Sequence, residues 1–600
     1  MIEEHVRKAL TSALRDLYGV DIPESQIDLK QPPNPVWGDI AFNCFSFAKM
    51  EKMKAVPTVE IAKITAVPTT EIAQSLAENL SKIPTISSVQ QSGPYLNIRF
   101  NSDILFRAAV TVGREKDARL SESQCIMVEY LSPNTNKPLH LGHVRNGVLG
   151  SALANILEAV GHSVIRANLV NDRGIHICKS MIAWEHFANG ATPESTKTKG
   201  DHFVGDWYVR YSQEEKLDPT LEVTATEMLQ KWEAGDAGTL ELWRMMNGWV
   251  YSGFAQTYER YNFRFDKEYH ESDLYLLGKD TILDGLEKGV FVRNTDGAVV
   301  FRLDDKKIFG VNQDGSPKIS TLLRRDGTSV YLTQDVGTAI KKVEDFSADR
   351  SVYVVASEQR YHFQVLFAIL RALGYPWAER CYHFSYEMVE LPDGRMKSRE
   401  GNVVDADDLA DHMAVLAQKA IRSRPNNSGL TDAEIALRAE KIALAAIKFY
   451  LLRVDPQTII RFDPEKSLSF EGDTGPYCLY AYVRIRSILA RAQEVGWYET
   501  GTGAEKGHFG KLQEIEERVL ALNLSQLPNV IQSSAISYNP SMLADQILKI
   551  ARSFNQLYAK HSVLSGDQDL VEERLALMNA TAEALRWALS LLGIDVLEAM

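Results

Sequence analysis

Two histidines three positions apart, His140 and His143, are the clearest candidates for chemistry in this chain. They stand in the tetrapeptide HLGH, where a run typical of a buried strand gives way to an expected helix. A helix N-terminus attracts anions, and imidazoles placed there can donate hydrogen bonds to phosphate oxygens as charge develops on an attacked α-phosphorus. Gly142 leaves room for a flat base near the backbone. The pattern favours nucleotidyl transfer over the alternatives, which are a metal-binding pair and a chance match.

A second candidate is the basic loop GRMKSREGN, which runs from Gly394 to Asn402 and follows an expected strand. A cationic loop between glycines can close over a triphosphate, whereas surface loops with Lys and Arg are usually only solvated. Its occurrence in the same α/β region as HLGH favours ATP chemistry.

The segments around HLGH predict a parallel, Rossmann-like sheet. The apolar run IMVEYL indicates a buried strand, a helix is expected from Gly142 to Val160, and a second strand from Ser163 to Val170. Apolar residues recur in the helix at steps of three and four, as in a β-α-β unit. The α/β pattern resumes with VYVVAS at Val352.

The remaining segments place further domains around this core. Residues 187–270 have helical spacing, and residues 288–334 contain the β-like runs AVVFRL and SVYLT around Asp-Gly turns. We therefore predict an α/β fold with the following organisation: an N-terminal α+β domain (1–113), a Rossmann-like catalytic core (120–425) with an insertion around 187–330, and a C-terminal all-α helical bundle (430–600).

Composition limits the partners and the compartment. Lys and Arg total 66 and Asp and Glu total 79, so the net charge is −13 and any contact with nucleic acid has to come from local basic patches. The five cysteines include no C-x2-C pair, which argues against a disulfide framework and a structural zinc site and indicates a reducing, cytoplasmic compartment. The longest apolar run, Ile442 to Leu452, is too short to span a bilayer, so no membrane contact is expected.

The motifs together resemble one enzyme family. The segment VEYLSPNTNKPLHLGHVRN, Val128 to Asn146, is similar to the HIGH region of class I aminoacyl-tRNA synthetases, and RMKSREGN is similar to their KMSKS loop. More narrowly, the chain resembles the arginyl-tRNA synthetases, through the motifs SPNTNKP, YLTQDVG, SEQRYHF and TGPYCLYAYVRI and the final methionine. The resemblance implies a monomer that uses ATP with Mg²⁺ to join L-arginine to tRNA(Arg) through an arginyl-adenylate.

The resemblance also assigns roles to individual residues. The arginine-binding residues that it implies are Glu129, Asn134, Glu271, Tyr331, Asp335 and Gln359. The ATP-binding residues are His140, Gly142, His143, Met396, Lys397 and Ser398. The catalytic residues are Lys137, His140, His143, Lys397 and Arg399, and no metal ligand is expected. Carboxylates suit arginine because they pair with a planar guanidinium through two hydrogen bonds.

Two positions depart from the family pattern. In the basic loop, Ser398 stands where the phosphate-contacting lysine of the KMSKS pattern would lie, and Lys137, just before HLGH, is expected to supply the missing charge. In the segment Asn171 to Gly174, Arg173 stands where many relatives carry a tryptophan, and the sequence assigns it no role.

The outer domains are expected to bind tRNA. Tyr95 and Asn97 match the pair with which the family's N-terminal domain contacts a base, and Tyr480 and Arg484 lie on a basic, aromatic helix of the C-terminal bundle. Two alternatives remain: a small-substrate adenylyltransferase that shares the H-x-G-H helix start, and a catalytically silent, synthetase-like RNA-binding protein.

Overall fold

The computed structural model describes residues 2–45, 67–390, 404–423, 429–497 and 508–598. At its centre is a parallel sheet with the strand order β12-β11-β5-β6-β7. Its strands are β5 (Cys125–Glu129), β6 (Ser163–Val170), β7 (Lys267–His270), β11 (Arg350–Ala356) and β12 (Cys381–Tyr386). The chain order reverses between β5 and β11, and ligands of open parallel sheets bind at the carboxyl ends of the strands at such a point.

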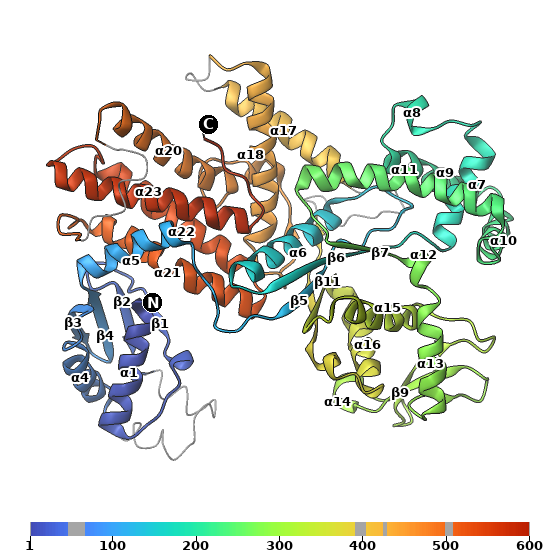
Figure 1. The fold of residues 1–600 in the computed structure, drawn as a ribbon, viewed down its shortest axis with the longest axis horizontal. Coiled ribbons are helices and arrows are strands. Elements are labelled where there is room, and N and C mark those ends of the chain that lie inside the picture. The colour runs from blue at the N-terminus through green and yellow to red at the C-terminus, as the bar shows by residue number, and fades with distance from the viewer. Residues whose placement is uncertain (1, 46–66, 391–403, 424–428, 498–507, 599–600) are drawn as a thin grey trace.

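Helix α6 (Leu141–Ala159) connects β5 to β6, as expected from the sequence. The apolar residues that predict its sheet-facing stripe are all buried. The opposite side of α6 is covered as well, because it packs on α18 (Asp432–Leu452) and α21 (Ile515–Ser537) of the C-terminal bundle. Helix α6 therefore contacts both the central sheet and the C-terminal bundle (Figure 1).

A helical segment separates β6 from β7 and lies to one side of the sheet (Figure 1). It consists of α7 (Ile175–Phe187), α8 (Pro193–Thr196), α9 (Gly200–Glu214), α10 (Leu221–Glu233) and α11 (Ala237–Tyr261). The helical spacing of residues 187–270 predicts α8 to α11. It does not predict α7, which lies before that range, or strand β7, because the sequence KEYH is short and lacks an apolar alternation.

A second segment lies between β7 and β11. It contains α12 (Glu271–Leu274), α13 (Leu277–Glu287), β8 (Val292–Arg293), β9 (Val299–Leu303), α14 (Lys306–Phe309), β10 (Lys318–Leu323) and α15 (Tyr331–Phe346). The run AVVFRL forms β9 as predicted, but the β-like reading of SVYLT was wrong. Tyr331 begins helix α15, because Leu332, Val336 and Ala339 form a buried face at helical spacing. The antiparallel partners of β9 are β8 and β10, and the sequence predicts neither.

The N-terminal domain packs helices on an antiparallel sheet of order β1-β2-β4-β3. Its elements are α1 (Ile2–Tyr18), β1 (Leu29–Lys30), β2 (Ile40–Asn43), α4 (Thr69–Leu80), β3 (Ile86–Ser92), β4 (Tyr95–Phe100) and α5 (Ser102–Glu115). The amphipathic first helix and the strand in GPYLNIRF are therefore as predicted.

The C-terminal part is helical, as expected. The range 430–600 contains α18, α19 (Pro464–Ser467), α20 (Gly475–Glu494), α21, α22 (Ser541–Lys560) and α23 (Gln568–Leu591), and α17 (Ala406–Arg422) precedes it, within the range expected for the catalytic core. The remaining elements are α16 (Arg360–Ala372), the parallel pair β13 (Val389–Glu390) and β14 (Ile460–Arg461), and short 3-10 turns at Glu24–Gln26, Ser357–Gln359 and Pro376–Arg380. Among the described residues, none of the helices has the length and apolar character needed to cross a membrane.

The N-terminal domain is attached to the C-terminal bundle by a buried ion pair. Arg518 of α21 donates to Asp39 at 2.6 Å and to the carbonyl of Phe100 at 3.0 Å. Helix α5 packs on α23 so closely that a Cβ at Gly113 would lie 2.6 Å from the backbone of Ala580. The two ends of the chain thus form one body beside the central sheet (Figure 1).

Candidate active site

His140 and His143 cap the N-terminus of α6 and hold each other in place. The Nδ1 atom of His140 accepts a hydrogen bond from the backbone amide of Gly142, and Nδ1 of His143 accepts one from the amide of His140, both at 3.1 Å. A ring nitrogen that accepts carries no proton, so each neutral imidazole has its proton on Nε2. Burial, together with the charge of Lys137, lowers the pKa of His140 to about 3 and that of His143 well below its usual value. Both side chains are therefore neutral donors through Nε2.

Hydrogen bonds from α6 fix the loop that leads into HLGH. Asn146 accepts from the amide of Leu131 at 2.5 Å and donates to the carbonyl of Val354 at 2.8 Å. It thereby ties the end of β5 to β11 at the point where the strand order reverses. The wholly buried Arg145 donates to the carbonyls of Met388, Pro456 and Thr458.

The described residues that follow the basic loop pair directly with HLGH. The amide of Leu141 donates to the carbonyl of Val404, and the amide of Ala406 donates to that of Leu139, both at 3.0 Å. The side chain of Asp405 caps α17 through the amides of Asp407 and Asp408. Met396, Lys397, Ser398 and Arg399 lie outside the described residues.

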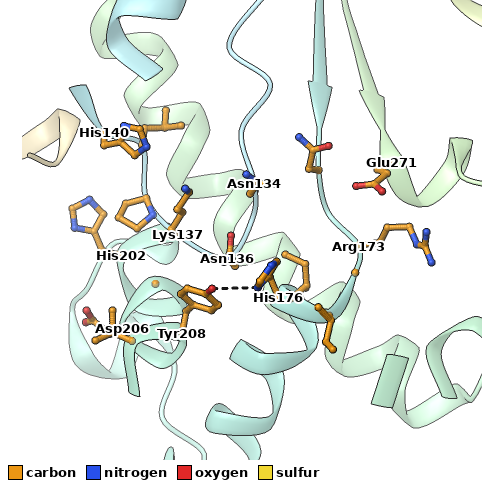
Figure 2. Close-up of a pocket in the computed structure, with 18 of the residues that line it drawn as sticks. Asn134, Asn136, Lys137, His140, Arg173, His176, His202, Asp206, Tyr208 and Glu271 are labelled. Carbon is orange, nitrogen blue, oxygen red and sulfur yellow. Dashed lines mark hydrogen bonds between the residues drawn. The ribbon is translucent and has the colours of Figure 1, made fainter. Parts of the chain in front are cut away.

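A cavity of about 440 Å³ opens at the carboxyl ends of β5 and β6. Its walls come from the HLGH loop, the loop after β6, helix α9 and the first residues of α12 and α15. The polar side chains in these walls are those of Asn134, Asn136, Lys137, His140, Asn171, Arg173, His176, His202, Asp206, Tyr208, Glu271, Tyr331 and Asp405. Figure 2 shows His140, His202 and Asp206 on one side and Glu271 and Arg173 on the other, with Asn134 and Lys137 between them.

Of the predicted arginine-binding residues, Asn134, Glu271 and Tyr331 line this cavity. Glu271 is the first residue of α12, and burial raises the pKa of its carboxyl to about 7. A half-buried carboxylate at the wall of a cavity favours a cationic ligand, because a bound cation compensates the cost of its charge.

The other three predicted arginine-binding residues lie outside the cavity wall. Glu129, at the end of β5, is buried and forms an ion pair with Lys342 of α15. Asp335, on the same helix, contacts Nε2 of His362 through Oδ2 at 2.6 Å. Gln359 is exposed in the turn after β11.

Only some of the nucleotide-binding residues predicted in and around HLGH reach the cavity surface. Lys137 and His140 line the cavity, whereas Gly142 and His143 do not. His143 supports His140 from behind, at 3.9 Å between the ring centres.

A charged cluster joins α9 to the start of α17, and the sequence analysis missed it. Lys199 donates to Asp201 at 3.1 Å and to Asp407 at 2.7 Å, and Nε2 of His202 lies 3.3 Å from Asp405. The hydrogen bond with Asp407 raises the pKa of His202. Asp201, His202 and Asp407 are close enough to hold an ion, but the ammonium of Lys199 already balances their charge. Helical spacing in α9 carries no information about this contact with a segment that follows much later in the chain.

The predicted tRNA-binding residues lie in the outer domains. Tyr95 and Asn97 are on β4, where Tyr95 is 45% exposed and Asn97 is buried. Arg484 of α20 donates to the hydroxyl of Tyr480 at 2.7 Å and stacks on Tyr558 of α22.

Comparisons with known proteins agree along the whole chain. Residues 106–462 match the model of the catalytic domain of class I tRNA synthetases (R), residues 2–100 the arginyl-tRNA synthetase N-terminal domain, and residues 478–600 the DALR anticodon-binding domain. The chain belongs to the arginyl-tRNA synthetase family. The family, the class I enzyme type and the fold class expected from the sequence are thus confirmed.

Individual members of the family cover the chain almost completely. An arginine–tRNA ligase of Bacteroides thetaiotaomicron is 39% identical, with 99% of each chain covered, and one of Treponema denticola is 42% identical over 96% of this chain and 95% of its own. The Thermus thermophilus arginyl-tRNA synthetase structure has a TM-score of 0.82 at 26% identity, with both chains fully covered. A Plasmodium falciparum structure, at 16% identity, shares the fold with a TM-score of 0.77 over 99% of this chain and 98% of its own.

Proposed function

We propose that the protein joins L-arginine to tRNA(Arg) with ATP, through an arginyl-adenylate formed in the cavity. The observation that carries the proposal is that one cavity holds both the imidazole of His140 and the carboxylate of Glu271. The first suits a phosphate and the second a guanidinium. An amino acid that bridges these two sides would place its own carboxylate near the α-phosphate of ATP.

The phosphate side contains the groups that adenylate formation needs. The carboxylate of arginine attacks the α-phosphorus, the bond to the β-phosphate oxygen breaks, and pyrophosphate leaves. Nε2–H of His140 donates to an α-phosphate oxygen as its charge grows, and Lys137 adds a positive charge. The Mg²⁺ that ATP carries is part of the substrate. Gly142, His143 and the loop residues Met396, Lys397, Ser398 and Arg399 complete the proposed nucleotide site.

The arginine side is built from Glu271, Asn134 and Tyr331. Glu129, Asp335 and Gln359 belong to the same proposal. Glu129 ends β5 and Gln359 follows β11, the two strands at the switch point, and Lys342 of the helix that carries Asp335 pairs with Glu129. Their side chains would reach the substrate after a rearrangement that the bound amino acid itself stabilises.

The outer domains are proposed to hold the tRNA. Tyr95 and Asn97 on one side and Tyr480 and Arg484 on the other offer aromatic rings and hydrogen-bond donors to unstacked bases. Because the two domains pack on each other, they present one continuous body to the RNA. The protein is proposed to act in the cytoplasm as a monomer.

The test is ATP–pyrophosphate exchange with each amino acid, with and without tRNA(Arg). The proposal requires exchange that depends on arginine, and transfer of labelled arginine to tRNA(Arg). Exchange without any amino acid would indicate a small-substrate adenylyltransferase, and tight tRNA binding without exchange would indicate a silent RNA-binding protein.

A further inference from the structure

Arg173, to which the sequence assigns no role, is held in a tightly defined place beside the arginine side of the cavity. Its side chain is only 9% exposed. The guanidinium lies 4.2 Å from the ring centre of Tyr275 and 5.3 Å from that of Trp232, both within cation–π distance. Its Nη2 donates to Glu233 at 2.6 Å. This set of contacts fixes the plane of the guanidinium and leaves Nη1 to a further partner.

The amide of Gln334 connects Arg173 to Glu271. With its nitrogen towards the acid, Gln334 donates to Oε1 of Glu271 at 3.0 Å and accepts from Nη1 of Arg173 at 3.1 Å. This orientation is required, because the opposite one would set the amide oxygen against a carboxylate and the amide nitrogen against a guanidinium. Arg173 therefore polarises a hydrogen bond that ends on Glu271.

Arg173 influences the Glu271 carboxylate through Gln334 and forms no direct ion pair with it. Among the described residues, no lysine, arginine or histidine forms an ion pair with the Glu271 carboxylate, which stays available at the cavity wall. A direct pair with Arg173 would fill the place of a cationic substrate. The amide of Gln334 lies between the two charged groups, so the positive charge of Arg173 still favours the ionised form of Glu271, and the carboxylate stays free to pair with a substrate cation.

The other charged groups around Glu271 oppose its ionisation or are neutralised by their own partners. Asp172 and Asp335 both raise the pKa of Glu271, and Arg173 lowers it. Asp172 accepts from Tyr251 and Ser272 and contacts His270, and Asp335 contacts His362. Arg173 is thus the cation that counteracts burial and two neighbouring acids.

We propose that Arg173 is a positioning residue which, through Gln334, orients the Glu271 carboxylate and preserves its charge for the guanidinium of the substrate. This inference rests on the proposed function, since it requires that the cavity binds arginine. It also accounts for the arginine in the Asn171–Gly174 segment, where the guanidinium has a partner on each side.

The inference is tested by the steady-state kinetics of four single variants and of the double variant that combines Arg173→Met with Gln334→Met. Arg173→Met removes the charge, Arg173→Lys keeps the charge without the planar fork, and Gln334→Met breaks the connection. Glu233→Gln is the matched control, because it removes a half-exposed charge on the far side of the guanidinium and keeps an oxygen that can accept from Nη2. KM for arginine, KM for ATP and kcat are measured between pH 6.5 and 8.5, and thermal unfolding of each variant is recorded.

We expect Arg173→Met and Gln334→Met each to raise KM for arginine about tenfold at pH 7, with kcat and KM for ATP within about twofold. The double variant should be no worse than either single one, because both remove the same connection. KM for arginine in Arg173→Lys should lie between the values of these variants and of the unmodified protein, and Glu233→Gln should change it little. The increase in KM for arginine should become smaller towards pH 8.5, where Glu271 loses its proton even without the charge of Arg173.

An unchanged KM for arginine in Arg173→Met, or equal losses in all three constants at every pH, would overturn the inference. If Arg173→Met fails to fold, Arg173→Lys and Gln334→Met still decide it. Absence of arginine-dependent exchange in the unmodified protein is a separate outcome, because it overturns the proposed function itself.

Discussion

Nδ1 of His143 accepts a hydrogen bond from the backbone amide of His140 at 3.1 Å, while Nδ1 of His140 accepts from the amide of Gly142. Both imidazoles are therefore part of the helix cap, and that of His140 also lines the cavity. The backbone dictates their tautomer, so their Nε2–H groups are set before any substrate arrives. Such fixed donors stabilise a developing charge without reorganisation.

His140→Ala should lower kcat for adenylate formation by about 10² or more, because a donor to the transition state is lost. His140→Asn is the matched variant, since its amide can retain the cap at the start of α6. Single-turnover adenylate formation and thermal unfolding are measured for both. A loss of stability large enough to explain the whole loss of activity would assign the histidine a purely structural role.

The same histidines should make the protein less stable in mild acid. The pKa of each is lower in the folded state than in the unfolded one, where it is near 6.5. Below pH 6.5 the unfolded chain binds protons that the folded chain does not, so the free energy of unfolding falls by up to about 1.4 kcal/mol per pH unit for each histidine. Urea unfolding at pH 7.5, 6.5 and 5.5 measures the slope. It should be shallower in His140→Asn, and an identical slope would contradict the assignment.

Lys137 should be essential, because Ser398 offers no positive charge in the basic loop. Lys137 lines the cavity beside His140, and its charge lowers the pKa of both histidines. We expect Lys137→Ala to reduce adenylate formation about as severely as the loss of His140, and Ser398→Lys to restore part of it. Single-turnover assays of the two single variants and the double variant test this. Full activity of Lys137→Ala would contradict this role and would indicate that Lys397 or Arg399 supplies the positive charge.

The ion pair between Lys342 and Glu129 should be costly to break from one side. The two side chains are 2% and 8% exposed, so Lys342→Met would leave a buried carboxylate without its cation. The expected loss is about 3 to 5 kcal/mol of unfolding free energy, measured by urea denaturation. Adding Glu129→Gln should recover most of it, because no buried charge then remains. A Lys342→Met protein as stable as the original would show that the carboxylate finds water or another partner.

The parts of the site that depend on local sequence could be predicted. A buried strand, a loop and a helix that starts at His140 follow from the apolar pattern and the capping residues, and the structure places Lys137 and His140 at one cavity as expected. The sequence also indicated that the five cysteines form no framework, and those in the described residues are unpaired.

The contacts that depend on distant segments could not be predicted. Helix α9 reaches the start of α17 through Lys199 and Asp407, and neither residue has a local feature that marks the other as its partner. Val330, Tyr331 and Thr333 favour strands, so the sequence predicts a β-like run there. Leu332 and Val336 instead pack in the core of the segment between β7 and β11, as residues of helix α15. The proposed role of Arg173 likewise depends on Gln334 and Glu271, which are distant in the sequence and come beside it only in the folded protein.

The central claim is that Glu271 recognises the guanidinium of arginine in the cavity where ATP reacts. The measurement that tests it most directly is kcat/KM for arginine and for citrulline in ATP–pyrophosphate exchange, with tRNA(Arg) present, in the unmodified protein and in Glu271→Gln. Citrulline is neutral, so it should be used at least about 10²-fold less efficiently by the unmodified protein, and Glu271→Gln should reduce this preference mainly by losing arginine. Equal use of the two amino acids by the unmodified protein, or an unchanged preference in Glu271→Gln, would contradict the account.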